Sequence, residues 1–312
     1  MPRVNPVAAR LTVLALAFGA LAGCAAQPRT EVIAAPLEPG VGKLTEADVA
    51  TFSDLNYGGA DGIPLLLDAC LPPESADGSS RAAVLIIHGG SWARGTKADE
   101  GYARICRMLA AAGFAAFSMD YRLAPAHVFP AAIDDVETAV RWLRAPEQVE
   151  AFDLDPTRIA AYGGSAGGNL AALLGTRGEG DLTTGSRVAA VVDLSGPIDL
   201  SGIAATADFV PVQLAYLGCA TDADCPAALE ASPLSHIDPT DPPFFVAHST
   251  SELIPLEQSA IFVGALRAAD VSVEFVTVDG TLHSIAMLDD ELDQRILDFL
   301  TAALAPPGGG AA

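Results

Sequence analysis

The sequence predicts an α/β protein whose central sheet is mostly parallel and carries helices on both faces. Two observations predict this class. Apolar runs of strand length alternate with longer helical patterns along most of the 312 residues. Hydrophobic residues make up 51% of the chain, which is enough for a large buried core and excludes disorder for most of it.

The first 23 residues have the features of a secretory signal peptide. Arg3 and Arg10 precede the apolar run Leu11 to Leu21, which is too short to span a bilayer as a mature helix. The run ends in LAGC, which resembles the lipobox of bacterial lipoproteins, where cleavage before the cysteine is coupled to lipidation of its thiol. We therefore expect an exported lipoprotein that Cys24 anchors to the cell membrane on its extracytoplasmic side. The alternative is an ordinary secreted protein in which Cys24 is incidental.

Three further segments follow the signal peptide. Residues 24–45 contain scattered proline and glycine without a sustained period, as expected of a flexible tether. Residues 46–305 form the globular domain, and residues 306–312, PPGGGAA, are expected to be a disordered tail.

The alternation of patterns within the domain gives the expected elements in order. The expected strands span Ile63–Leu71, Ala83–Ile87, Phe114–Met119, Arg158–Tyr162, Ala189–Leu194, Phe244–Ala247 and Val271–Val278. The expected helices span Glu100–Ala112, Pro130–Leu143, Ala166–Leu174, Pro255–Ala268 and Asp289–Leu304.

One segment interrupts this alternation. Residues 196–241 are rich in proline and aspartate and follow a strand, where α/β folds place binding elements. We interpret the segment as a lid, and the alternative is a surface insertion without a function.

The cysteines predict disulfides. Without Cys24, an even number remains in a chain that we expect to reach an oxidising compartment. Cys219 and Cys225 enclose a short polar loop that a bridge could close, which leaves Cys70 and Cys106 as the second pair. A metal site is the weaker interpretation, because the spacings match no zinc pattern and no histidine lies near Cys219 or Cys225 in the sequence.

The charge excludes one class of partner. The formal net charge is −22, and the chain has no basic cluster, so a polyanion would be repelled and we expect no nucleic-acid partner. The acidity is better interpreted as solubility of an exported surface. Nothing in the sequence indicates an oligomeric state.

A glycine-rich turn predicts a catalytic nucleophile. Gly163-Gly164-Ser165-Ala166-Gly167 lies between an expected strand and an expected helix and fits G-x-S-x-G, the nucleophile elbow. In such an elbow the serine has a strained backbone conformation, and small neighbours prevent collisions across the tight turn. The alternative is a glycine-rich turn without a catalytic role. The presence or absence of a base, an acid and oxyanion donors elsewhere in the sequence distinguishes the two interpretations.

A serine hydroxyl needs a base, a carboxylate that orients the base, and donors for the developing oxyanion. His283 follows the last expected strand, as the base does in hydrolases with the chain order Ser, acid, His. Glu252 is the first carboxylate after the preceding strand and is our choice for the acid. Asp241 lies before that strand, Asp279 shares the loop of His283, and Glu257 falls on the following helix.

The expected oxyanion hole combines two segments. The amide after the nucleophile, that of Ala166, is one donor, and a loop after an early strand supplies the others. The stretch VLIIHGGSW contains such a loop, with Gly89 and Gly90 at its turn. We expect His88 to brace this loop rather than to transfer protons.

Several longer stretches resemble one family. HGGSW, DYRLAPAHVFPAAIDDVETAVRWLR, DPTRIAAYGGSAGGNLAALLGT and ASPLSHIDPTDPPFFVAHSTSELIPLEQS are similar to the α/β-hydrolase esterases of the hormone-sensitive-lipase and BD-FAE-like group, over residues 55–304. The resemblance implies hydrolysis of carboxylic esters without a cofactor or metal, with Ser165 as nucleophile, His283 as base and an acid. It also implies Gly90, Ser91 and Ala166 as oxyanion donors supported by Gly89, and a structural role for Asp120, Tyr121, Arg122, Asp134 and Asp135.

The chain departs from this family in three respects. Ser91 stands where the family often has a third glycine. The loop from His248 to Pro255 is one residue shorter than the family's pattern, and Ser249 replaces a glycine. An alignment from the proline puts Ser251 at the acid position, whereas an alignment from the histidine puts Glu252 there.

The sequence therefore predicts a carboxylesterase-type serine hydrolase with a Ser165–His283–Glu252 triad, acting on small or short-chain acyl esters through an acyl-enzyme. Cleavage of amides or formamides on the same fold is a second hypothesis. A third is an anchored binding protein that has lost catalysis, as the altered acid loop suggests.

Overall fold

The structure, a computed structural model, describes residues 45–73, 78–201 and 209–306. The predicted signal peptide, Cys24, almost all of the tether and residues 307–312 of the tail lie outside the described residues.

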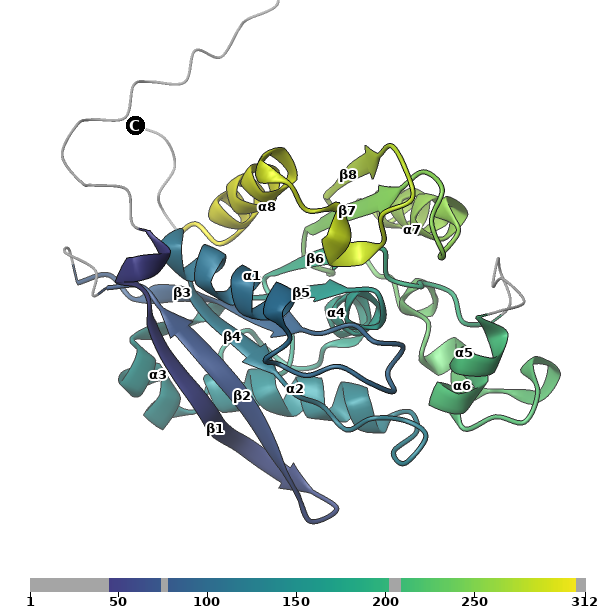
Figure 1. Ribbon diagram of the computed structural model, residues 1–312, viewed down its shortest axis with the longest axis horizontal. Coiled ribbons are helices and arrows are strands. Elements are labelled where there is room, and N and C mark those ends of the chain that lie inside the picture. The colour runs from purple at the N-terminus through teal and green to yellow at the C-terminus, as the bar shows by residue number, and fades with distance from the viewer. Residues whose placement is uncertain (1–44, 74–77, 202–208, 307–312) are drawn as a thin grey trace, which may run out of the picture. The chain divides into compact units, whose positions relative to one another are not determined.

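The described residues form one eight-stranded sheet with the strand order β1-β2-β4-β3-β5-β6-β7-β8 (Figure 1). Strands β3 to β8 run parallel, whereas β2 is antiparallel to both of its neighbours. This confirms the predicted mostly parallel sheet. The strands are β1 (Ala50–Ala60), β2 (Ile63–Leu71), β3 (Arg81–Ile87), β4 (Ala115–Met119), β5 (Leu154–Gly164), β6 (Ala190–Leu194), β7 (Phe244–Ser249) and β8 (Val273–Val278).

Helices cover both faces of the sheet. The α-helices are α1 (Glu100–Ala111), α2 (Ala131–Leu143), α3 (Pro146–Phe152), α4 (Ala166–Arg177), α5 (Val210–Leu217), α6 (Ala227–Glu230), α7 (Leu256–Ala268) and α8 (Asp290–Ala303). Short 3₁₀ turns are η1 (Glu46–Asp48), η2 (Asp222–Asp224), η3 (Pro233–Ser235) and η4 (Ser284–Met287). Helices α1 and α8 pack on one face, and α2, α3, α4 and α7 pack on the other (Figure 1).

The core divides into two layers because successive strand residues point to opposite faces. In β3, Val84 and Ile86 pack in the layer under α1 and α8, whereas Leu85 and Ile87 pack in the layer under α2 and α4. All four side chains are fully buried, which is why this strand reads as a continuous apolar run.

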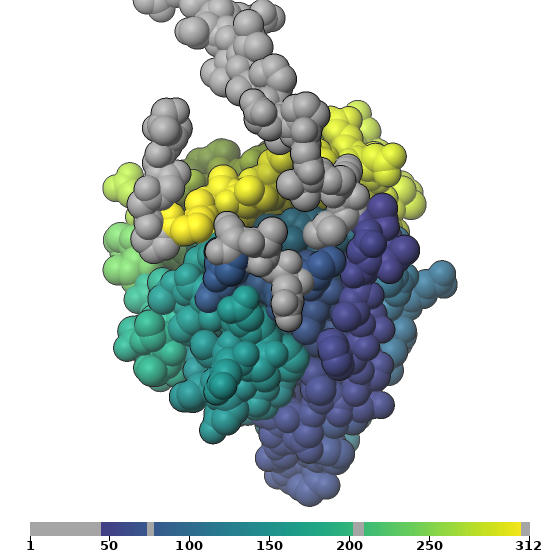
Figure 2. Space-filling view, turned by 90° about the vertical axis from the view of Figure 1, so that its left-hand side faces the viewer, coloured from purple at the N-terminus to yellow at the C-terminus, as the bar shows by residue number. Residues whose placement is uncertain are grey.

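Strand β1 was not among the expected elements. Most of its residues are exposed, and two register shifts against β2 interrupt any regular alternation. Strand β2 pairs with β4 only over Leu67 to Cys70, so the part of the β1–β2 hairpin near its turn extends past the end of β4. In Figure 2 the hairpin, in purple and blue, projects from the remainder of the domain.

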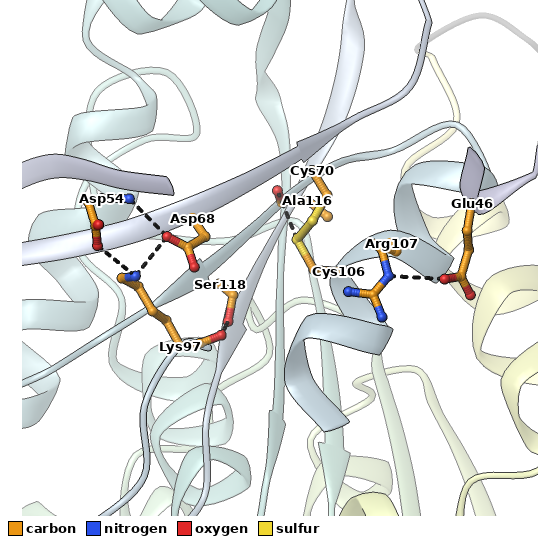
Figure 3. The surroundings of a disulfide bond; sticks show 9 residues. All are labelled: Glu46, Asp54, Asp68, Cys70, Lys97, Cys106, Arg107, Ala116 and Ser118. Atoms are coloured by element: carbon orange, nitrogen blue, oxygen red, sulfur yellow. Dashed lines mark hydrogen bonds and ion pairs between the residues drawn. A yellow bond between two sulfur atoms is a disulfide. The ribbon is translucent and has the colours of Figure 1, made fainter. Parts of the chain in front are cut away.

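The structure contains two disulfides, in the pairs that the sequence suggests. Cys70 in β2 bonds Cys106 in α1, and Cys219 bonds Cys225 in the segment predicted as a lid. Beside the first of them, Lys97 forms ion pairs with Asp54 (2.9 Å) and Asp68 (2.7 Å), as Figure 3 shows. The disulfide and these ion pairs join the β1–β2 hairpin to α1 and to the loop that precedes it.

Candidate active site

Ser165 occupies the sharp turn between β5 and α4. Its backbone is left-handed, with φ 58° and ψ −123°, and its amide donates to the Leu194 carbonyl oxygen (2.8 Å). A Cβ atom on Gly163 would lie 2.0 Å from the Gly167 carbonyl oxygen, so no larger residue fits there. The geometry is that of the predicted nucleophile elbow and holds the hydroxyl at the carboxyl edge of the sheet.

His283 reaches the elbow from the loop between β8 and η4. Its Nε2 atom lies 2.8 Å from the Ser165 Oγ atom, although the two residues are 118 positions apart in the chain. Its Nδ1 atom forms a hydrogen bond with Oε2 of Glu252. The imidazole therefore bridges the hydroxyl and the carboxylate, which is the arrangement that a general base needs.

Glu252 follows β7, and its side chain has no exposed surface. Burial alone would raise its pKa, but the neighbouring polar groups of His248, His283 and Ser195 outweigh burial and lower the pKa of Glu252 to about 2. Glu252 is thus an anion at neutral pH. Ser251, the alternative at the acid position, is exposed, and its amide donates to the Gly280 carbonyl oxygen. The structure therefore brings Glu252, rather than Ser251, to His283.

The loop after β3, residues 88–92, packs directly against the elbow, and we call it the oxyanion loop. A Cβ atom on Gly89 would lie 2.7 Å from the Gly164 carbonyl oxygen and 3.3 Å from the Ser165 Cβ atom. The Gly89 amide is already used, because it donates to the Tyr102 hydroxyl. Among the described residues, the amides of Gly90, Ser91 and Ala166 have no such acceptor, so they remain available to an oxyanion.

Tyr102, on α1, is a site residue that sequence reasoning missed. Its hydroxyl accepts the Gly89 N–H (2.6 Å) and lies 3.4 Å from the Gly164 carbonyl oxygen. One phenol thus contacts both the oxyanion loop and the elbow. Only its helical period marked it in the sequence, as a core position.

His88 braces the oxyanion loop, as expected. Its ring is buried, stacks on Tyr121 (centroids 4.3 Å apart), and its Nδ1 atom lies 2.7 Å from the Gly89 carbonyl oxygen. Burial lowers the pKa of His88 and so favours a neutral ring. The Tyr121 hydroxyl donates to the His88 carbonyl oxygen (3.0 Å) and so holds the start of the loop. The next residue, Arg122, forms an ion pair with Asp135 of α2 (2.8 Å).

The described part of the predicted lid, residues 196–201 and 209–241, contacts the same loop. Trp92, which follows Ser91, is buried and stacks on Tyr216 of α5 with ring centroids 4.2 Å apart. Asn169 of α4 donates to the carbonyl oxygens of Pro197 and Ala231. The segment is therefore packed at the carboxyl edge of the sheet beside the elbow.

The residues that the structure describes lack two further features. They contain no group of three or more potential metal-ligating side chains. None of their helices is both long and apolar enough to cross a membrane.

Comparisons with known proteins agree with this geometry. The sequence model of the BD-FAE family matches residues 67–266. Esterase LipC of Mycobacterium tuberculosis is 38% identical over 221 residues, which cover 67% of this chain and 54% of LipC. Esterase LipQ of the same organism is 30% identical over 245 residues, which cover 75% of this chain and 57% of LipQ. The chain thus spans just over half the length of these curated relatives.

Solved structures are similar over most of the chain. A truncated form of a carbohydrate esterase from gut microbiota has a TM-score of 0.71 and 25% identity, covering 85% of this chain and 100% of that chain. Thermogutta terrifontis esterase 2, in the form phosphorylated by paraoxon, has a TM-score of 0.65 and 26% identity, covering 84% of this chain and 97% of that one. Its propionate-bound form has a TM-score of 0.66 and 26% identity, with coverage of 84% and 98%.

Proposed function

The chain belongs to the BD-FAE family of α/β-hydrolase fold proteins, and we propose that it is a serine hydrolase that cleaves carboxylic esters. The observation that carries this proposal is the continuous contact from the Ser165 hydroxyl through the His283 ring to the buried Glu252 carboxylate. The Ser165 end of this contact lies beside the oxyanion loop. A nucleophile, a base and donors that can stabilise an oxyanion are therefore close together.

The reaction begins when the Ser165 oxygen attacks the ester carbonyl and His283 accepts its proton. Glu252 stabilises the imidazolium that forms. The amides of Gly90, Ser91 and Ala166 hold the oxyanion, and one such donor accounts for roughly 10²–10³ in rate. The alcohol leaves with the proton from His283, and the acyl-enzyme on Ser165 is then hydrolysed by water that the same histidine activates.

The proposed substrates are esters of small or short-chain acids. The related Thermogutta terrifontis esterase 2 binds propionate, an acid of this size. Two exposed leucines, Leu253 and Leu282, are neighbours of Glu252 and His283 in the chain, and we propose that they contact the acyl group. A series of p-nitrophenyl esters of increasing acyl length tests this preference: we expect kcat/KM to be highest for the shortest acyl groups, and a maximum at long acyl chains would contradict it.

The reaction type is tested with Ser165→Ala. We expect the wild-type protein to hydrolyse p-nitrophenyl acetate and to be labelled by a fluorophosphonate, and Ser165→Ala to lose both properties while keeping its far-UV circular dichroism. Ser235→Ala, at a serine in the predicted lid, is the matched control and retains both. A Ser165→Ala protein with the wild-type rate would exclude Ser165 as the nucleophile.

We also propose that the protein is exported and anchored to the membrane through a lipid on Cys24. The order of charge, apolar run and LAGC supports this, and so does the pairing of the other cysteines in disulfides. In cells, the wild-type protein is expected in the membrane fraction and Cys24→Ala in the soluble fraction. If both proteins fractionate alike, Cys24 is not the anchor.

A further inference from the structure

A second imidazole contacts the carboxylate of Glu252. His248, near the end of β7, is fully buried, and its Nε2 atom lies 3.0 Å from Oε1 of Glu252. The same Nε2 atom is 2.8 Å from the Ile254 carbonyl oxygen, and Nδ1 is 2.7 Å from Oγ of Ser259 on α7. The ring is therefore held at both nitrogens. The proposed reaction gives it no role.

The partners of His248 determine where its proton lies. The Ile254 carbonyl and the Glu252 carboxylate can only accept hydrogen bonds, so the Nε2 atom between them must carry a hydrogen. The Ser259 hydroxyl can either donate or accept, so it satisfies Nδ1 in the neutral and in the protonated ring. In both states the Nε2–H donates to the Ile254 carbonyl oxygen and lies beside Oε1 of Glu252, the oxygen that His283 does not contact.

A buried carboxylate needs donors on both oxygens, because an unsatisfied buried charge is strongly unfavourable. His283 contacts Oε2 alone. Glu252 is also one methylene longer than aspartate and so has an additional rotatable bond. The His248 Nε2–H, held 3.0 Å from Oε1, would restrict that freedom by attracting Oε1 and would aim Oε2 at His283.

We propose that His248 is a positioning residue of the triad, whose Nε2–H holds Oε1 of Glu252 and thereby orients the carboxylate toward His283. This inference rests on the proposed function.

The titratable groups around this contact come from three elements: Asp193 on β6, Glu252 after β7 and His283 after β8. Burial raises the pKa of Asp193 to about 7, so Glu252 is the main anion that faces His248 below neutral pH. A donor on Oε1 withdraws charge from the carboxylate and so lowers the proton affinity of His283. Its removal must therefore shift the acidic limb of the kcat/KM profile to higher pH.

The test compares His248→Phe, which removes the donor, with His248→Gln, whose side-chain amide can still donate to Oε1. Both are assayed on p-nitrophenyl acetate from acidic to alkaline pH. We expect His248→Phe to lower kcat about 10- to 100-fold with little change in KM, as the loss of a charged hydrogen bond predicts, and to shift the acidic limb upward. His248→Gln is expected to recover part of the rate and most of the profile.

A merely structural role would lower the amount of folded protein without moving the acidic limb. The inference is therefore wrong if His248→Phe leaves the limb unmoved, or if His248→Gln and His248→Phe have the same profile. Should His248→Phe fail to fold, Ser259→Ala decides, because it frees the ring while keeping both nitrogens: a lower kcat with a shifted limb supports the inference, and a wild-type profile overturns it.

These outcomes differ from a failure of the proposed function. If the wild-type protein neither hydrolyses esters nor reacts with a fluorophosphonate, the proposed function and this inference both fall. If the wild-type protein is active and the variants leave its pH profile unchanged, only the role of His248 is wrong.

Discussion

Three residues of the elbow and of the loop after β3 have left-handed backbone although they are not glycine. Ser165 has φ 58°, Ser91 has φ 58° and Trp92 has φ 54°. Such conformations are unfavourable for L-residues and persist where the surrounding structure holds them. Here the elbow, the stacked ring of Tyr216 and the packing of Gly89 against Gly164 supply that support.

Ser91 offers a direct test of this strain. A β-branched residue fits the left-handed region poorly, so Ser91→Val is expected to lower the free energy of unfolding by about 1–2 kcal/mol and to reduce kcat by displacing the oxyanion amides. Ser91→Gly, which restores the family's common residue, is expected to keep kcat near the wild-type value. Urea unfolding and ester hydrolysis measure the two effects, and equal behaviour of both variants would contradict the argument.

Tyr102 connects the oxyanion loop to the elbow through a single oxygen atom. Tyr102→Phe removes it and leaves the buried Gly89 N–H without its acceptor, so we expect a loss of about 1–3 kcal/mol in the free energy of unfolding. Because the oxyanion loop loses its tie to the elbow, kcat is also expected to fall.

The matched control for Tyr102→Phe is Tyr162→Phe. The Tyr162 hydroxyl is buried and has no hydrogen-bond partner among the described residues, so its removal is expected to leave kcat unchanged. If both variants keep the wild-type kcat, Tyr102 does not position the loops.

Part of this site was predictable from the sequence. Ser165 and His283 were predicted from a local turn and from chain order, and the structure brings their side chains together. Glu252 was our choice for the acid, but a loop one residue shorter also allowed an alignment with Ser251, and only the fold decides which side chain reaches His283. Tyr102 was missed because its hydroxyl contacts loops that are remote in the sequence. The role of His248 was missed because its contact with Glu252 depends on the fold of a shortened loop. No local sequence pattern indicates contacts of either kind.

At the scale of elements, strands buried on both faces were the easiest to predict. Strands β3 and β6 are short apolar runs with every residue or nearly every residue buried. Strand β1 was missed because it is exposed and irregular, and α3 because a seven-residue helix beginning at Pro146 has too few turns to show a period. Helices α5 and α6 lie in the segment interpreted as a lid, where proline and aspartate suggested loop.

The two disulfides close loops of very different size. The cysteines are 36 positions apart in the first pair and 6 in the second. Since a bridge stabilises mainly by restricting the unfolded chain, the double variant Cys70→Ala/Cys106→Ala is expected to lose about 4 kcal/mol and Cys219→Ala/Cys225→Ala about 2 kcal/mol. Urea unfolding of the oxidised proteins measures the difference, and a larger loss for the second pair would contradict this explanation.

At the scale of the whole molecule, two buried acids give the stability opposite dependences on pH. The pKa of Glu252 is lowered to about 2, so its contribution to stability is complete above about pH 4.5 and is lost as the pH falls toward 2. Asp193 behaves in the opposite way. Burial raises its pKa to about 7, so the folded protein keeps a proton that the unfolded chain releases near pH 4.

Asp193 therefore destabilises the folded state progressively as the pH rises from about 4 to 7. Asp193→Asn, which keeps an oxygen for the Gly196 amide, is expected to raise the melting temperature more at pH 8 than at pH 5. Asp290→Asn, at an exposed aspartate, is the control and is expected to show the same small change at both pH values. A gain for Asp193→Asn that does not depend on pH would contradict the assignment.

The distance along the chain between Ser165 and His283 has a consequence for how this protein is renatured. The two side chains meet only after β6, β7 and β8 have been added beside β5, so a hydrolysed ester reports a completely assembled sheet. Far-UV dichroism, by contrast, counts helices that form locally and early. During refolding, ester hydrolysis is therefore expected to recover later than the far-UV ellipticity. The ratio of recovered activity to recovered ellipticity measures the fraction of molecules whose sheet is fully assembled.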